Sequence, residues 1–253
     1  MTEENKFKKV ATIQLYSDNI GAVSLYDASH ANESEEQRIW TVTTLASLAY
    51  GNEEAKQPEA LYKRMQSIRH ESLWEFIRIG NDYFSPLGYD MRNFMHADNY
   101  QYPYEVASTH SQNIACFRIK VPMFVRSQFM RHRSASYLEM SRRYTKGAKI
   151  PFEFWSPVGF VYDSAHALNE YQSCIDAGME TQIASRFLPQ TTYTEFYCMF
   201  EVEGLANFLR LRLDSHAQAE IRETAVAMLE LLRVHQPTLY AKISHINRTT
   251  HVN

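Results

Sequence analysis

The stretch NIACFRIKV, residues 113–121, alternates between two sets of side chains. One face of an extended chain would carry Ala115, Phe117, Ile119 and Val121. The other face would carry Ile114, Cys116, Arg118 and Lys120. This two-residue period predicts a half-buried strand. Pro122 follows at a position suited to the first turn of a helix, which would lead into the basic segment 131–133.

Further elements are predicted on both sides of this strand. Upstream we expect a strand at 9–16, a helix at 34–50 ended by Gly51, and a helix from Pro58 to about Arg69. Downstream we expect a helix at 164–178, a strand at 191–202 and a helix at 204–213. This order predicts an α+β fold in which helices pack on a mixed or antiparallel sheet.

The C-terminal part of the chain predicts one more helix, which runs up to Pro237. Its start is expected at a capping box formed by Ser215 and Gln218. One apolar face would contain Ile221, Ala225, Met228, Leu229 and Leu232. No linker divides the chain, so we expect a single domain, 1–253. Within it, residues 78–112 are rich in Asn, Asp, Tyr and Gly and predict an insertion.

Composition excludes several classes of protein. The chain has 253 residues, 45% of them hydrophobic, and a net charge of -3, so it is not expected to coat nucleic acid or an anionic membrane. Three dispersed cysteines favour neither a disulfide framework nor a zinc site, and no metal is expected. Without an apolar run long enough to span a bilayer or an apolar signal core, we expect a cytoplasmic protein.

Positive charge is concentrated between residues 126 and 149. This segment holds one acid, Glu139, and seven basic residues: Arg126, Arg131, Arg133, Arg142, Arg143, Lys146 and Lys149. Guanidinium groups suit phosphates, so the cluster could hold a nucleotide. It could also be a solvated face, or the contact surface of a nucleotide- or nucleic-acid-binding protein.

Arg212 falls on the apolar stripe of the helix predicted at 204–213, four residues after Phe208. An unpaired buried charge is costly, so either a carboxylate or an anionic ligand is expected beside it. The adjacent run Asp214-Ser215-His216 contains the residue types of a hydrolase triad. Neighbouring side chains point apart, so we expect a helix cap there instead.

The segment RHRSASYLEMSRRY, residues 131–144, resembles the RHRxxSxxxxSxR signature of flavin-dependent thymidylate synthases. Three other blocks are similar to the same family: RHESLWEF (69–76), RSQFMRHR (126–133) and NFLRLRLDSHAQ (207–218). The resemblance covers about 42–77 and 113–235, and the insertion has no counterpart in it. The resemblance implies the fold of flavin-dependent thymidylate synthases. It also implies the conversion of dUMP to dTMP, with methylenetetrahydrofolate as carbon donor and FAD and NADPH for the reduction. It also implies a homotetramer with sites at subunit junctions. As the composition already indicates, no nucleic-acid or membrane partner is expected.

The resemblance also assigns roles to residues. For dUMP it implies Gln128, Arg131, Glu139, Ser141, Arg142, Arg143, Arg186 and Arg212. For FAD it implies His70, Ser72, Glu75, Arg131, His132, Arg133, Glu139, Asn207 and His216. The folate or NADPH region would contain His70 and Tyr144. Arg212 is the expected catalytic residue, whereas Ser141 is expected to bind dUMP and not to act as a nucleophile.

Three residues, at two places in the chain, depart from the family pattern in ways that bear on the site. Glu201 and Glu203 stand where many members have an Asn-x-Arg that touches FAD. Ser185 stands where members have an arginine for the dUMP phosphate, with Arg186 as the nearest replacement. If the two acids prevent flavin binding, the chain would bind the nucleotide without flavin.

Overall fold

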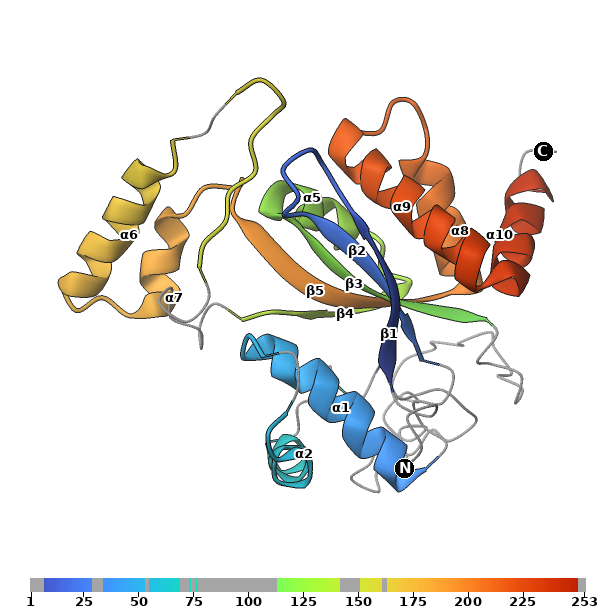
Figure 1. Ribbon diagram of the computed structural model, residues 1–253, viewed down its shortest axis with the longest axis horizontal. Helices are drawn as coiled ribbons and strands as arrows, with labels where there is room; N and C mark the ends of the chain where they lie inside the picture. The colour runs from blue at the N-terminus through green and yellow to red at the C-terminus, as the bar shows by residue number, and fades with distance from the viewer. Residues whose placement is uncertain are drawn as a thin grey trace, which may run out of the picture.

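A computed structural model describes residues 7–28, 34–52, 55–68, 73, 76, 113–141, 151–160 and 163–249 (Figure 1). The strands are β1 (Lys8–Gln14), β2 (Ala22–Asp27), β3 (Ile114–Pro122), β4 (Ala135–Glu139) and β5 (Tyr193–Glu201). The helices before β5 are α1 (Glu35–Ala49), α2 (Pro58–Ser67), α5 (Met123–Phe129), α6 (Ala165–Asp176), α7 (Thr181–Ala184) and the 3-10 helix η4 (Ser185–Phe187). Those after it are α8 (Val202–Arg212), α9 (Ala219–His235) and α10 (Pro237–Thr249). The insertion predicted at about 78–112 lies outside the described residues.

The described strands form one sheet in the order β1-β2-β3-β5-β4, and every neighbouring pair is antiparallel. The longest ladder joins β3 and β5, from Ile114 opposite Glu201 to Pro122 opposite Tyr193. The predicted α+β class is confirmed, and the sheet is of the antiparallel kind. None of the described helices combines the length and apolar composition needed to cross a membrane.

Helices cover both faces of the sheet (Figure 1). On one face, α5, α8, α9 and α10 contribute to a main core whose buried rings are Phe117, Phe129, Phe196, Phe200 and Phe208. On the other face, α1 and α2 pack in a second core that includes Tyr26, Cys116 and Tyr197. Side chains of β5 alternate between the two cores, as the two-residue period of a strand requires.

The strand predicted at 113–121 is present as β3, but the half-buried description is wrong for its first half. Ile114 and Cys116 lie on the face expected to be exposed, yet they are 8% and 0% exposed because they belong to the second core. Farther along, Arg118 Nε contacts Glu195 Oε1 at 2.8 Å. Ion pairing therefore lets this charge remain in a largely covered sheet.

The ends of α1 follow from local chemistry. The hydroxyl of Ser34 accepts a hydrogen bond from the backbone N–H of Gln37 at 3.2 Å, and Glu35 and Glu36 lie in the first turn. After the helix, Gly51 has a φ of +68°, a conformation that glycine adopts without the steric penalty of a Cβ. The predicted helix at 34–50 and its end are confirmed.

The start of α9 differs from the prediction. The N-cap residue is Gln218, without a side-chain capping bond, so the capping box with Ser215 is wrong. The helix-cap interpretation of Asp214-Ser215-His216 is also wrong. The Asp214 carboxylate instead accepts a hydrogen bond from the backbone N–H of His216 at 2.8 Å, which closes a turn between α8 and α9.

The predicted apolar face of α9 is confirmed. Ile221, Ala225, Met228 and Leu232 are buried, and Leu229 packs partly buried against the main core.

Besides the short α7 and η4, three described elements were not predicted. β2 is joined to β1 by a short turn and pairs with it. β4 lies inside the basic motif, where serines interrupt the alternation of apolar and polar residues. α10 begins at Pro237, which was expected to end the preceding helix. A proline also suits the first position of a helix, so the same residue ends one helix and begins the next.

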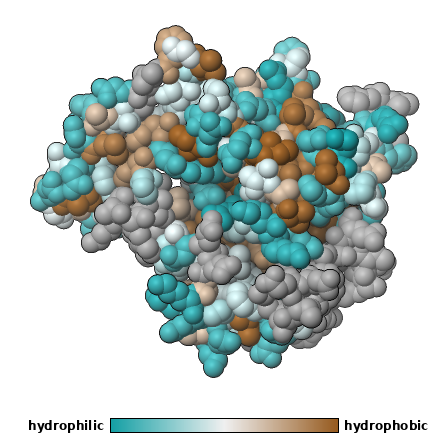
Figure 2. Space-filling model, in the orientation of Figure 1, coloured by the Kyte–Doolittle hydropathy of each residue, from teal (hydrophilic) through white to brown (hydrophobic). Residues whose placement is uncertain are grey.

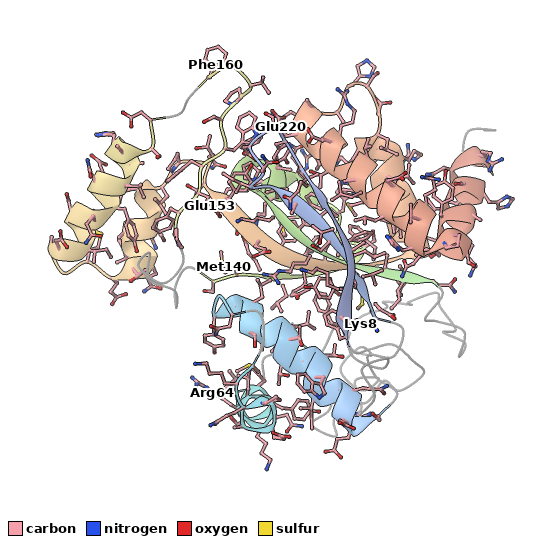
Figure 3. The ribbon with its side chains drawn as sticks, viewed as in Figure 1. Lys8, Arg64, Met140, Glu153, Phe160 and Glu220 are labelled. Carbon is pink, nitrogen blue, oxygen red and sulfur yellow. The ribbon has the colours of Figure 1, made fainter. Side chains whose placement is uncertain are left out.

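The arm formed by α6, α7 and η4 stands at one side of the sheet, away from α8, α9 and α10 (Figure 1). Val158 and Phe160, in the loop before it, are 82% and 74% exposed, and Figure 3 shows Phe160 at the tip of that loop. Phe187 on η4 is 51% exposed. Hydrophobic residues reach the surface both on this arm and over the α8–α10 side (Figure 2).

We expect Phe117→Ala to lower the free energy of unfolding by about 3–5 kcal/mol, because the fully buried ring would leave a cavity in the main core. The measurement is urea-induced unfolding followed by circular dichroism. Val226→Ala, at an exposed position of α9, serves as the control and should change the free energy by less than about 0.5 kcal/mol. Equal effects of the two substitutions would contradict the assignment of the core.

Candidate functional site

The turn between α5 and β4 carries the first residues of the basic motif. The backbone N–H of His132 donates to the carbonyl of Phe129 at 2.9 Å, so the chain turns directly after the helix. Arg131 and Arg133 are exposed on this turn, whereas His132 between them is only 7% exposed. The turn thus separates two solvent-facing cations from one buried imidazole.

His132 is held by α8. Its ring packs edge-on against Phe208, with ring centroids 4.8 Å apart. Its Nε2 accepts a hydrogen bond from Nε of Arg212 at 2.9 Å. Because Nε2 is the acceptor, the proton of the neutral ring belongs on Nδ1.

The pKa of His132 is lowered to about 4, first by burial and then by the positive charges of Arg212 and Arg131. The imidazole is therefore neutral at pH 7 and gains a proton only near or below pH 4. A neutral ring can accept the hydrogen bond from Arg212, whereas an imidazolium cannot.

Arg212 is half-buried and has no carboxylate partner within the described residues. Besides the bond to His132, its Nη2 donates to the carbonyl of Gln128 at 3.2 Å. Its place in the apolar stripe predicts either a carboxylate or an anionic ligand beside it. No such carboxylate occurs among the described residues. Burial, followed by the charge of Arg131, lowers the pKa of Arg212.

The charge of Arg212 is stabilised by the ends of two helices. Arg212 is the last residue of α8, and Gln128 lies in the last turn of α5. Carbonyl groups at the end of a helix lack partners within the helix and carry a partial negative charge, which favours a cation. These dipoles hold the guanidinium without neutralising it, so its net positive charge remains.

The N-terminus of α9 lies beside the same cations. The side-chain amide of Gln128 donates to Oε1 of Gln218, the N-cap of α9, at 2.5 Å. An N-terminus without a side-chain cap has free N–H groups and a partial positive charge, which favours anions. Arg131, Arg212 and the start of α9 therefore form a junction that suits an anionic group.

This junction fits a phosphate-bearing ligand or cofactor. The cations Arg131 and Arg133 have no acidic partner among the described residues, whereas Arg118, Arg126 and Arg233 are all paired with glutamates. Free guanidinium groups next to a partly buried one match the charge and geometry of phosphate oxygens. The residues that the structure describes contain no cluster of three His, Cys, Asp or Glu side chains that could hold a metal ion.

Glu139 is engaged inside the chain. One carboxylate oxygen contacts Nη2 of Arg126, and the other accepts a hydrogen bond from the hydroxyl of Thr194 at 2.8 Å. The carboxylate thereby ties α5, β4 and β5 together. Ser141 follows closely, with its backbone N–H bonded to the carbonyl of Ala49 at 3.3 Å.

Asn207 and His216 point to solvent rather than toward the Arg212 side chain. The Asn207 side chain accepts a hydrogen bond from Arg210 at 2.8 Å on the exposed side of α8, about 140° around the helix from Arg212. His216 is 95% exposed in the turn after α8 and contacts Asp214. Within one protomer, these two predicted flavin residues are not gathered with His132.

Arg186 is exposed on η4, and the arm to which it belongs lies far from α8 (Figure 1). One protomer therefore does not bring Arg186 and Arg212 together. Glu201 and Glu203 are exposed at the start of α8, about 14 Å or more along the helix from Arg212. Acids are favourable at a helix N-terminus, which gives these residues a structural role.

Six predicted site residues lie outside the described residues: His70, Ser72, Glu75, Arg142, Arg143 and Tyr144. Tyr137 and Gly204 contact the site but were not singled out from the sequence, and Gln218 was singled out only as part of a capping box. Their contacts depend on strand pairing and helix packing, for which a single sequence carries no local signal.

We expect Arg212→Ala to raise the pKa of His132 above about 4, because a nearby positive charge is removed. The pKa should stay below the ordinary histidine value, since burial is the larger cause. Arg131→Ala should raise it less, and Arg233→Ala, whose charge is paired with Glu230, should leave it unchanged. Nitrogen-detected NMR titration of the imidazole measures these values. A His132 that titrates near pH 6.5 in the unmodified protein would contradict the observed burial.

Several curated proteins are similar in sequence to about half of this chain. A flavin-dependent thymidylate synthase of Thermotoga neapolitana is 37% identical over 140 residues, which are 49% of this chain and 63% of that protein. Proteins of the same name from Treponema denticola and Thermus thermophilus are 31% and 32% identical, over 51% and 49% of this chain and 59% and 54% of their own lengths. The chain thus matches less than two thirds of the length of these relatives.

A family profile gives the broader result. The profile described as thymidylate synthase complementing protein matches residues 95–238, more than half of the chain. The match contains the whole junction described above, from α5 through the start of α9. It begins inside the segment predicted as an insertion, so residues 95–112 have a counterpart in the family profile, and the expectation that the whole insertion has none is wrong. The chain therefore belongs to the thymidylate synthase complementing protein (Thy1) family.

Proposed function

We propose that this protein methylates dUMP to dTMP, with methylenetetrahydrofolate as carbon donor and FAD-mediated reduction by NADPH. The observation that carries the proposal is the half-buried Arg212, which keeps its charge beside a neutral His132 and the exposed Arg131. The names of the matched relatives support the same activity.

Arg212 is the proposed catalytic residue. Two of its N–H groups are bonded to His132 and Gln128, and the others have no partner among the described residues. A positioned donor whose charge is not neutralised can stabilise negative charge that develops on the uracil ring. A carboxylate in place of His132 would cancel much of this effect, so the neutral imidazole is a suitable partner.

The other site residues keep the roles implied by the resemblance. Gln128, Arg131, Glu139, Ser141, Arg142, Arg143 and Arg186 would bind dUMP with Arg212. Arg131, His132 and Arg133 would hold FAD together with His70, Ser72, Glu75, Glu139, Asn207 and His216. His70 and Tyr144 would face the folate or NADPH. The guanidinium groups of Arg131 and Arg133, which have no acidic partner among the described residues, suit the pyrophosphate of FAD. A bound flavin would supply the hydride chemistry, which amino-acid side chains lack.

We further propose a homotetramer with sites at subunit junctions. Arg186 is a free cation in the described chain, on an arm far from Arg212 (Figure 1). The same arm exposes Phe187, and the loop before it exposes Val158 and Phe160. Apolar surface of this kind suits contact with another subunit. In such an assembly, Arg186 of one protomer would complete the phosphate site of another.

We expect the purified protein, supplied with FAD, to show flavin absorption bands that NADPH bleaches faster in the presence of dUMP. The physical reason is that the nucleotide and the flavin would share the cations of one junction. The measurement is anaerobic visible spectroscopy, with dUMP omitted as the control. If FAD does not bind, the proposed chemistry is wrong and nucleotide binding without flavin becomes the better hypothesis.

We expect Arg212→Ala to lower dTMP formation by about 100-fold or more, because it removes a positioned donor for developing negative charge. Bound flavin and thermal stability should change little. Arg233→Ala, which removes an exposed arginine paired with Glu230 on α9, is the control and should keep full turnover. Unchanged dTMP formation in the Arg212 variant would remove the catalytic assignment.

A further inference from the structure

The hydroxyl of Tyr137 lies between two backbone carbonyls of the turn that carries Arg131 and His132. It donates to the carbonyl of Phe129 at 2.8 Å and to the carbonyl of His132 at 3.0 Å. A tyrosine hydroxyl has a single proton, so the two acceptors share it in a three-centre bond. One side-chain atom therefore connects both ends of the turn.

The carbonyl of Phe129 needs hydrogen-bond partners from outside the helix. Phe129 is the last residue of α5, and carbonyls at a helix end have no partner in the helix. The Phe129 carbonyl also accepts the backbone N–H of His132 at 2.9 Å. The hydroxyl of Tyr137 thus fixes the path of the chain as it leaves α5, where water could otherwise compete.

Tyr137 is itself held in place. It lies on β4 opposite Cys198 of β5, and its ring packs near Phe196 and Phe200, with centroids 6.2 Å and 6.3 Å away. Burial raises the pKa of the hydroxyl, so it remains a donor at ordinary pH. The donor therefore belongs to the rigid sheet, not to the turn that it holds.

On its other side the turn is packed against α8. A Cβ added to Gly204 would lie 2.8 Å from both the backbone oxygen and the hydroxyl of Ser134. No side chain fits at this position unless Ser134 moves. The turn is therefore fixed twice, by a hydrogen bond from β4 and by close contact with the first turn of α8.

We infer that Tyr137 is a positioning residue that sets the place of His132 and Arg131, and through His132 that of Arg212. This inference rests on the proposed function for its consequence in catalysis. Its structural part depends only on the hydroxyl and the two carbonyls. The hydroxyl of Tyr137 bonds to the two carbonyls, so Tyr137 acts through the residues of the turn.

Tyr137→Phe tests the inference, because it removes the hydroxyl and keeps the ring in the core. The first readout is the NMR titration of His132, whose pKa should rise from about 4 toward the ordinary value as the ring loses its fixed place beside Arg212. The second readout is dUMP affinity by calorimetry, which we expect to fall by about 3- to 10-fold, the loss typical of one hydrogen bond. Tyr171→Phe is the matched control, since Tyr171 is buried on α6 against Phe152.

Gly204→Ala is the second variant and perturbs the same turn from the side of α8. It should also raise the pKa of His132, even if Tyr137→Phe folds poorly. An unchanged His132 titration in the folded variants would overturn the inference, and the proposed function would stand. If the unmodified protein binds neither dUMP nor FAD, the proposed function fails, whereas the titration still decides whether Tyr137 positions His132.

Discussion

The antiparallel ladder between β3 and β5, nine residues on each strand, is the constraint on which the site depends. α5 begins at Met123, directly after β3, and α8 begins at Val202, directly after β5. Because the strands are antiparallel, these helices start at opposite ends of the ladder. Both pack on the same face, as the stacked rings of Phe129 and Phe208 show, with centroids 4.8 Å apart. The register of one strand pair thus decides which residues of the two helices can meet.

Helix lengths then bring the C-terminal ends of α5 and α8 together. α5 spans about 10 Å and α8 about 16 Å, whereas nine residues of strand span about 31 Å. Two helices that turn back over the sheet from its opposite ends therefore meet near its middle. Arg212 ends one helix and bonds to the carbonyl of Gln128 in the last turn of the other. The partial negative charges of both helix ends explain how a guanidinium can be half-buried there without a carboxylate.

The sequence predicts the parts of this arrangement that rest on local patterns. Alternation identifies β3, and the apolar stripes identify α8 and α9 and place Arg212 away from bulk solvent. β4 was missed because its five residues lie in a polar motif whose pairing with β5 is not a local property. The partner of Arg212 was missed for the same reason, since His132 is 80 positions away and reaches it only through the ladder. The resemblance names both residues, but it does not show that they touch.

The choice of partner determines what Arg212 can do. A buried carboxylate would lower the energy of the guanidinium more than an imidazole does, and it would also cancel the charge toward any ligand. A neutral His132 accepts one N–H group and leaves the charge in place, and it stays neutral because burial and two arginines oppose its protonation. The charge of Arg212 and the neutrality of His132 therefore maintain each other. A turn that moved away from α8 would lose both properties together. The contacts of Tyr137 and Gly204 with this turn therefore matter to the chemistry of the Arg212 guanidinium, to which neither residue is hydrogen-bonded.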